Sequence, residues 1–110
     1  MEKEGYTILH DLLSKDLQLD DEEALISGEE KPDLNLFHQK LTTLVLYLLD
    51  RDMPRLLNAM YRLDVNEQKF HEAMKSESKE EAASNIARLV LEREMQKVKT
   101  RLHYKTHRKF

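Results

Sequence analysis

The histidines are the first residues whose spacing could support chemistry, because imidazole is the commonest metal ligand and a frequent general base. His103 and His107 are four residues apart, which would place both on one face of a helix, as in many metal sites. A zinc site needs a third or fourth ligand, however, and neighbouring cations such as Arg101 and Lys105 would repel a metal ion. The pattern therefore favours a solvated basic tail, and we expect no metal site.

The other residue types that often catalyse reactions stand alone in this chain. His71 precedes Glu72, but the second histidine of a zinc-protease helix is missing. Nothing in the sequence orients the acids Asp50 and Asp52 for acid–base work, and Asp52 is better explained as a helix cap. The chain has no cysteine, and no serine has the flanking glycines of a nucleophile elbow. We therefore expect no catalytic residue, no cofactor and no enzymatic activity.

Basic residues near the carboxyl end form the strongest candidate for binding. The candidates are Arg93, Lys97, Arg101, Lys105, Arg108 and Lys109. Steps of four place the first four along one ridge of a helix, beside its apolar stripe, and Tyr104 and Phe110 could stack on bases. Basic residues near the carboxyl end of a helix also complement its dipole, which is a sufficient structural reason for some of them.

The charge is distributed unevenly along the chain, although the net charge is only −3. Residues 1–34 hold eleven acids and three bases, residues 35–74 hold five of each, and residues 88–110 hold two acids and eight bases. Such asymmetry says more about partners than about fold. It is typical of solvated helix ends, and it also predicts that the acidic segment 16–33 and the basic segment 93–109 attract one another.

A polar cluster lies where the second, third and fourth predicted helices meet. It consists of Tyr47, Arg51, Arg55, Tyr61, Arg62 and Asp64. Buried arginines and tyrosine hydroxyls need hydrogen-bond partners, so a structural network at a turn is the favoured interpretation. A ligand pocket is the alternative.

Apolar residues at steps of three and four predict five helices and no strand. The first begins near Tyr6, the second follows a cap at Asp33, and the third carries Pro54 in its first turn. The fourth follows Asp64 or Asn66 as its cap. The fifth follows a capping box that begins at Ser78, and it is the longest, from Glu80 to about Tyr104. A fifth helix of roughly 37 Å exceeds what the others can cover. The fold class expected is all-α, a compact bundle of about five helices with a long basic C-terminal helix.

The second helix is the most apolar segment, and its last two turns are apolar nearly all round. It should be the centre of the core or a seam between two subunits, with the last helix as the alternative seam. The expected core is led by Phe37, Leu41, Leu44, Val45, Leu48, Leu57, Met60, Phe70, Ile86, Leu89, Val90 and Leu91.

The length of 110 residues suits a single helical domain, with an acidic flexible loop at about 18–33 and a basic tail at about 103–110. The chain start lacks a basic flank and an apolar run, and the longest apolar stretch, residues 44–49, has six residues. We therefore expect neither a signal peptide nor a transmembrane helix. The missing cysteines fit a reducing compartment, so a cytoplasmic location is expected.

Two segments carry a resemblance to other proteins. The sequences Leu-Asn-Ala-Met-Tyr-Arg-Leu-Asp-Val-Asn-Glu at 57–67 and Ile-Ala-Arg-Leu-Val-Leu-Glu-Arg at 86–93 resemble small uncharacterised all-helical bacterial proteins. The resemblance covers residues 41–97. It implies a bacterial, soluble, single-domain helical protein, and it transfers no activity.

Two functions from different classes fit the sequence. The first is a helical interaction or assembly module, which binds a protein partner or itself and forms a homo-oligomer, because the second helix offers an excess of apolar surface. The second is binding to nucleic acid or nucleoprotein through the basic residues of the last helix. A membrane surface is not expected as a partner, because the apolar face of that helix lacks Trp and is needed for the core.

Overall fold

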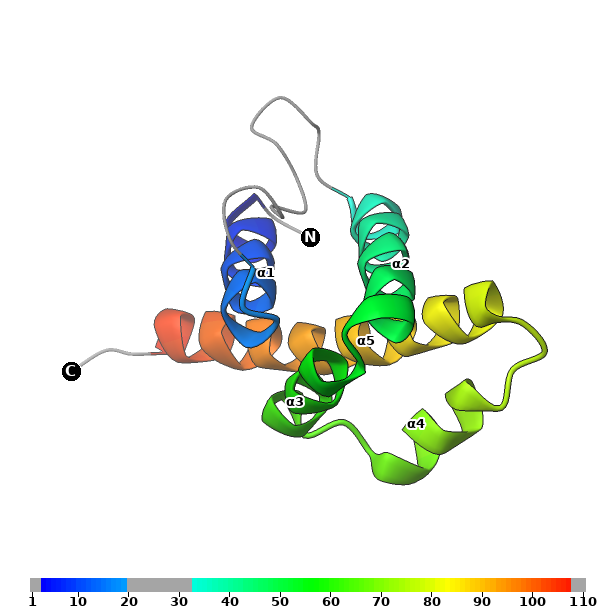
Figure 1. Cartoon of the computed structure of the whole chain (residues 1–110). Helices are drawn as coiled ribbons and strands as arrows, with labels where there is room; N and C mark the ends of the chain where they lie inside the picture. Colours follow the sequence, from blue (N-terminus) through cyan, green and yellow to red (C-terminus); the bar gives the residue numbers. More distant parts are fainter. Residues whose placement is uncertain (1–2, 20–32, 108–110) are drawn as a thin grey trace.

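The computed structural model describes residues 3–19 and 33–107, and the side chains up to residue 104. Every regular element in these ranges is an α-helix (Figure 1). The helices are α1 (Lys3–Asp16), α2 (Leu34–Arg51), α3 (Met53–Leu63), α4 (Glu67–Met74) and α5 (Lys79–His107). The all-α prediction, with five helices and a long C-terminal one, is confirmed. Of the expected acidic loop, residues 20–32 lie outside the described part, as do residues 108–110 of the tail.

The long helix α5 is the element on which the other four pack. In Figure 1 it runs across the molecule, with α1 and α2 rising steeply from one side and α3 and α4 lying on the other. Its first half buries Ala82, Ala83, Ile86, Ala87 and Val90. Small side chains let the crossing helices approach closely, while Ile86 and Val90 fill the space between them.

Local capping signals set most helix boundaries, as the sequence predicts. The Asp33 carboxylate accepts a hydrogen bond of 2.8 Å from the Leu36 backbone N–H at the start of α2. Asp52 both ends α2 and begins α3, since its N–H donates to the Leu48 carbonyl and its carboxylate accepts from the Arg55 N–H. The Ser78 hydroxyl accepts from the Glu81 N–H at the start of α5. Each cap satisfies a backbone group that the helix leaves unpaired.

The two cap candidates between α3 and α4 have separate roles. The Asn66 side chain accepts from the Lys69 N–H and caps α4. Asp64 instead ends α3 in a left-handed conformation with φ of 57°, and its N–H donates to the Tyr61 carbonyl. Aspartate enters this region more readily than most residues other than glycine. Asp64 therefore turns the chain out of α3, and Asn66 starts the next helix.

The core contains most of the predicted residues and several others that the prediction left out. Buried as expected are Phe37, Leu41, Val45, Leu48, Met60, Ile86 and Val90. Leu44, Phe70, Leu89 and Leu91 are partly buried against this cluster. The omitted residues include Leu56 and Leu63 of α3. They also include a set from α1 and the residue that follows it, namely Leu9, Leu12, Leu13 and Leu17.

The prediction that Leu57 belongs to the core was wrong. Its side chain is 47% exposed, whereas Leu56 beside it is buried. Helix α3 packs on α1, α2 and α5 from one side only, so its buried face is Leu56, Ala59, Met60 and Leu63. Adjacent helical residues point about 100° apart, and Leu57 therefore faces outward.

The predicted Tyr/Arg/Asp cluster does not form one network. Arg55 donates from Nη2 to the carbonyls of Leu17 and Gln18, at 3.2 and 3.1 Å, and so ties α3 to the end of α1. Asp64 lies 3.7 Å from Arg93 on α5 instead. Tyr47 and Tyr61 are exposed. The cluster is thus divided between separate contacts, and the structural interpretation holds for Arg55.

Truncation of Leu48 tests the central place of α2 in the core. The side chain is 1% exposed, so Leu48→Ala should lower the free energy of unfolding by about 2 to 5 kcal/mol through lost burial and a cavity. Leu34→Ala on the same helix removes the same atoms from a side chain that is 37% exposed. That control should lose less than about 1 kcal/mol in urea denaturation. A loss below about 0.5 kcal/mol for Leu48→Ala would contradict its burial.

Candidate functional site

Three of the predicted phosphate-binding residues line one groove between α1 and α5, here called the basic groove. Its volume is about 470 Å³. It is lined by Leu12, Lys15, Asp16, Arg93, Gln96, Lys97, Thr100 and Arg101. The groove brings Lys15, from α1, beside the row of cations on α5, an addition that the sequence did not predict. The side chains of Lys105, Arg108 and Lys109 lie outside the described part of the chain.

Lys97 joins the two helices that form the groove. Its Nζ lies 3.1 Å from Asp16 Oδ2 on α1 and 3.7 Å from Glu94 Oε1 on α5. The first distance is a charge-assisted hydrogen bond, and the second places the Lys97 ammonium beside the buried Glu94 carboxyl. Asp16 and Lys97 belong to the oppositely charged segments that the sequence predicts to attract one another. The described residues thus contain one such contact, and it is partly buried.

Glu94 is the feature of the site that the sequence analysis missed. Its side chain is 0% exposed, although it stands in the charged run Glu92-Arg93-Glu94. A signal was present, because Glu94 is four residues from both Val90 and Val98, which are buried on α5. Residues four apart share a helix face, and that face is turned toward the core.

Burial raises the pKa of Glu94 from 4.5 to about 8. The neighbouring Asp16 carboxylate acts in the same direction, whereas the Lys97 ammonium lowers the pKa. No N–H or O–H group among the described residues donates a hydrogen bond to either Glu94 oxygen. A buried carboxylate that receives no hydrogen bond loses its hydration without compensation, so burial penalises the charged form of Glu94. The protonated form of Glu94 is therefore favoured relative to an exposed glutamate.

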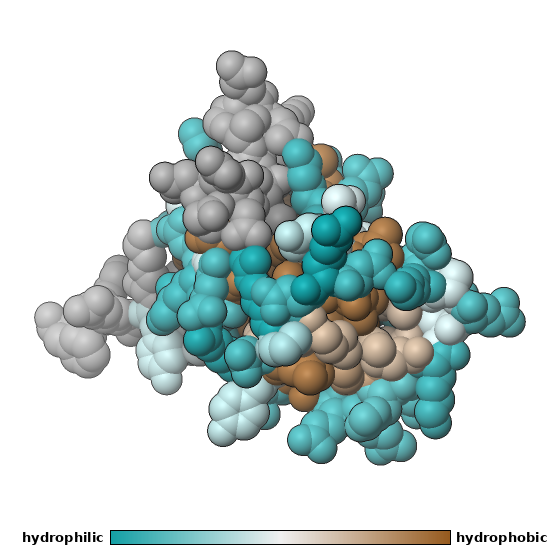
Figure 2. Space-filling view, viewed as in Figure 1, coloured by the Kyte–Doolittle hydropathy of each residue, from teal (hydrophilic) through white to brown (hydrophobic). Residues whose placement is uncertain are grey.

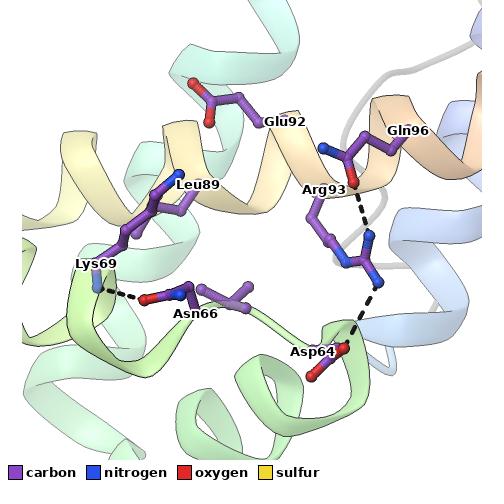
Figure 3. A pocket seen from close by; sticks show the side chains of 8 residues that line it. Asp64, Asn66, Lys69, Leu89, Glu92, Arg93 and Gln96 are labelled. Carbon is purple, nitrogen blue, oxygen red and sulfur yellow. Dashed lines mark hydrogen bonds and ion pairs between the residues drawn. The ribbon is translucent and has the colours of Figure 1, made fainter.

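Arg93 is held by neighbouring groups on two sides (Figure 3). Its Nε donates to the Leu63 carbonyl at 2.8 Å, and its Nη1 donates to Gln96 Oε1 at 2.7 Å. Its Nη2 lies 3.7 Å from Asp64 Oδ2. The Leu63 carbonyl is at the end of α3, where helical carbonyls lack partners within the helix. Arg93 thus fastens α3 to α5, and it also lines the basic groove.

The hollow drawn in Figure 3 lies between the α3–α4 turn and α5 and has a volume of about 320 Å³. Asp64 and Glu92 supply negative charge there, and Lys69 and Arg93 supply positive charge. The two negative and two positive charges balance, and Arg93 already contacts Leu63, Gln96 and Asp64. This hollow therefore favours no charged ligand.

A second surface, here called the apolar groove, lies between α3 and α4 and has a volume of about 690 Å³. Its lining residues are Leu57, Met60, Tyr61, Asp64, Val65, Glu67, Phe70 and His71. Tyr61 is 88% exposed. Figure 2 shows hydrophobic side chains reaching the surface over α3, between hydrophilic neighbours.

The described histidines take part in packing and in local contacts. His38 on α2 lies with Nε2 at 3.0 Å from the Ser84 carbonyl on α5, and so links these two helices. His103 packs edge-on against the ring of Tyr104. Among the described residues, no group of three or more His, Cys, Asp and Glu side chains is arranged to hold a metal ion.

Comparisons with protein families, with curated proteins and with solved structures give no significant match to this chain. No helix in the described ranges has both the length and the apolar character needed to cross a bilayer. Function is therefore inferred from the two grooves and their chemistry.

The raised pKa of Glu94 predicts a pH-dependent stability. In the unfolded chain this carboxyl ionises near 4.5, and in the folded protein near 8, so between these values the folded state binds one more proton. Stability contributed by this group is complete below about pH 4.5 and is lost as pH rises toward 8. The slope for one proton is about 1.4 kcal/mol per pH unit at most.

Glu94→Gln keeps the shape of the side chain and can donate its amide N–H to Asp16 without titrating. Urea unfolding at pH 6, 7 and 8 should show a falling free energy of unfolding for the wild type and a flatter profile for the variant. The variant should be the more stable protein at pH 8. Parallel profiles for the two proteins would show that Glu94 is ionised throughout.

Proposed function

We propose that the protein is a non-enzymatic assembly module that pairs with a second copy of itself through the apolar groove. The observation that carries the proposal is the exposure of Tyr61 and Leu57, which are 88% and 47% exposed over an apolar floor. Exposed apolar side chains grouped in one groove are typical of interaction sites. Tyrosine in particular is enriched among the residues that contribute most to binding.

The groove has the structure of an interface centre. Leu57 and Tyr61 are four residues apart, so they lie on the same face of α3. Between them and α4 are Met60, which is buried, and Val65 and Phe70, which are partly buried. A leucine or tyrosine from a partner placed there would bury apolar surface against these side chains, and such burial favours association.

The charges around the groove favour a second copy as the occupant. Asp64 and Glu67 line the groove and supply negative charge, and exposed Arg62 follows Tyr61 on α3. A two-fold axis brings the same patch of both subunits together. Arg62 of one copy can then face an acid of the other, so the rim complements itself.

The location of the proposed seam differs from the one that the sequence favoured. On α2, Val45 and Leu48 are buried and Leu44, Leu46 and Leu49 are partly buried, which leaves Tyr47 as the exposed member of that run. Most of the apolar excess of α2 is thus used inside the subunit. The exposed pair Leu57 and Tyr61 on α3 offers a broader apolar surface.

Sedimentation equilibrium of the full chain at about 100 μM tests the proposal, because weak assemblies with dissociation constants in the micromolar range form at that concentration. The wild type should show twice the monomer mass of 13.1 kDa. Leu57→Asp combined with Tyr61→Asp should give the monomer, since two buried charges without partners oppose association. Both side chains are exposed within the subunit, so helical content should be unchanged.

Tyr47→Asp is the matched control, because Tyr47 is 53% exposed on α2 and lies outside the apolar groove. This variant should dimerise like the wild type. A wild type that remains monomeric would refute self-association. If Tyr47→Asp is a monomer while the α3 variant remains a dimer, the interface lies on α2. That result would refute the assignment to the apolar groove.

A further inference from the structure

We propose that the basic groove between α1 and α5 binds the phosphate backbone of a single-stranded nucleic acid. The surface is distinct from the apolar groove, and the proposal does not depend on self-association. Four cations line it, Lys15, Arg93, Lys97 and Arg101, against the single carboxylate of Asp16. Glu94 lies beneath Lys97 and is fully buried. Glu94 does not line the groove, and its burial disfavours the charged form, so Asp16 is the one carboxylate that faces a ligand there.

The cations differ in how free they are to meet a ligand. The guanidinium of Arg93 is positioned by Leu63 and Gln96, and the ammonium of Lys97 is anchored by Asp16. Both groups are still about one-third exposed. Lys15 and Arg101 are exposed at the edges of the groove. Arg93 and Lys97 therefore provide preorganised positive charge, and the side chains of Lys15 and Arg101 can move to contact an anion.

A neutral donor adds to the positive charge. Gln96 accepts the Arg93 hydrogen bond on Oε1, so its amide NH₂ group remains to donate to a phosphate oxygen. Amide groups commonly contact phosphates together with Arg and Lys. The groove thus combines charge with a directed donor, as a backbone-binding site does.

An exposed aromatic residue favours nucleic acid over an acidic peptide. Tyr104 is 69% exposed and lies three residues after Arg101 and four after Thr100. Steps of three and four place Lys97, Arg101 and Tyr104 along one face of α5. Bases stack on such rings beside a cationic track, whereas an acidic peptide needs the cations alone.

Fluorescence anisotropy with a labelled twelve-nucleotide oligothymidine tests the proposal on the full chain. The wild type should bind at about 50 mM salt, and its affinity should fall as salt rises, because each neutralised phosphate releases counterions. Lys15→Gln combined with Arg101→Gln should weaken binding by about tenfold or more. It should also reduce the slope of log affinity against log salt by about 1.4, that is, about 0.7 for each lost contact on a single strand.

The matched control is Lys99→Gln, because Lys99 is exposed on the same helix but does not line the groove. This variant loses one positive charge, as each of the two substitutions in the double variant does. It should bind with an affinity within about twofold of the wild type. Tyr104→Ala should weaken binding and leave the salt slope unchanged, since stacking releases no counterions.

Three outcomes would overturn the proposal. The first is no binding by the wild type at about 50 mM salt. The second is an equal loss of affinity for each removed charge in the Lys99→Gln control. That result would indicate attraction by overall charge without a defined site. The third is competition by polyglutamate as effective as that by unlabelled oligothymidine, which would assign the groove to acidic peptides.

Discussion

The architecture depends on one helix that is long enough to be shared. Helices α1 to α4 have 8 to 18 residues each, and each packs on α5, which has 29. Isolated helices shorter than about 12 to 15 residues are marginal in water, and helices in proteins gain most of their stability from tertiary packing. The first half of α5 meets this need with an alanine-rich surface, and α2 lies against it with Phe37, Leu41, Val45 and Leu48 buried. The other helices are arranged around that contact.

The second half of α5 stabilises the helix packed on it through a contact that includes polar side chains. There, α1 meets a helix face that carries Glu94 between Val90 and Val98, and Asp16 and Lys97 complete the contact. Buried ionic groups seldom add stability relative to apolar residues of the same size. They do restrict how two helices can fit, because each charge must meet its partner. Asp16 stands at the end of α1, so the hydrogen bond to Lys97 fixes the position of α1 along α5.

The sequence predicted features that arise from neighbouring residues better than those that arise from distant ones. The caps at Asp33, Asp52 and Ser78 act within four residues of themselves, and all three were identified. The outward position of Leu57 depends on which helices cover α3, and periodicity alone does not contain that information. In the candidate site, the basic residue types of α5 were identified, but their contacts were not. Arg93 meets a carbonyl 30 residues away and Lys97 meets a carboxylate 81 residues away.

These long-range contacts also make the basic groove part of the structure that holds α1 and α3 in place. Lys97 has three N–H donors, and Asp16 uses one of them, so a phosphate can bind Lys97 without displacing Asp16. An anion beside Lys97 nevertheless repels the Asp16 carboxylate and favours the protonated form of Glu94 beneath it. Any anion that prefers the protonated state must, by reciprocity, bind more weakly once Glu94 ionises. The buried acid and the exposed cations therefore act as one electrostatic unit, because the charge of each group affects the others.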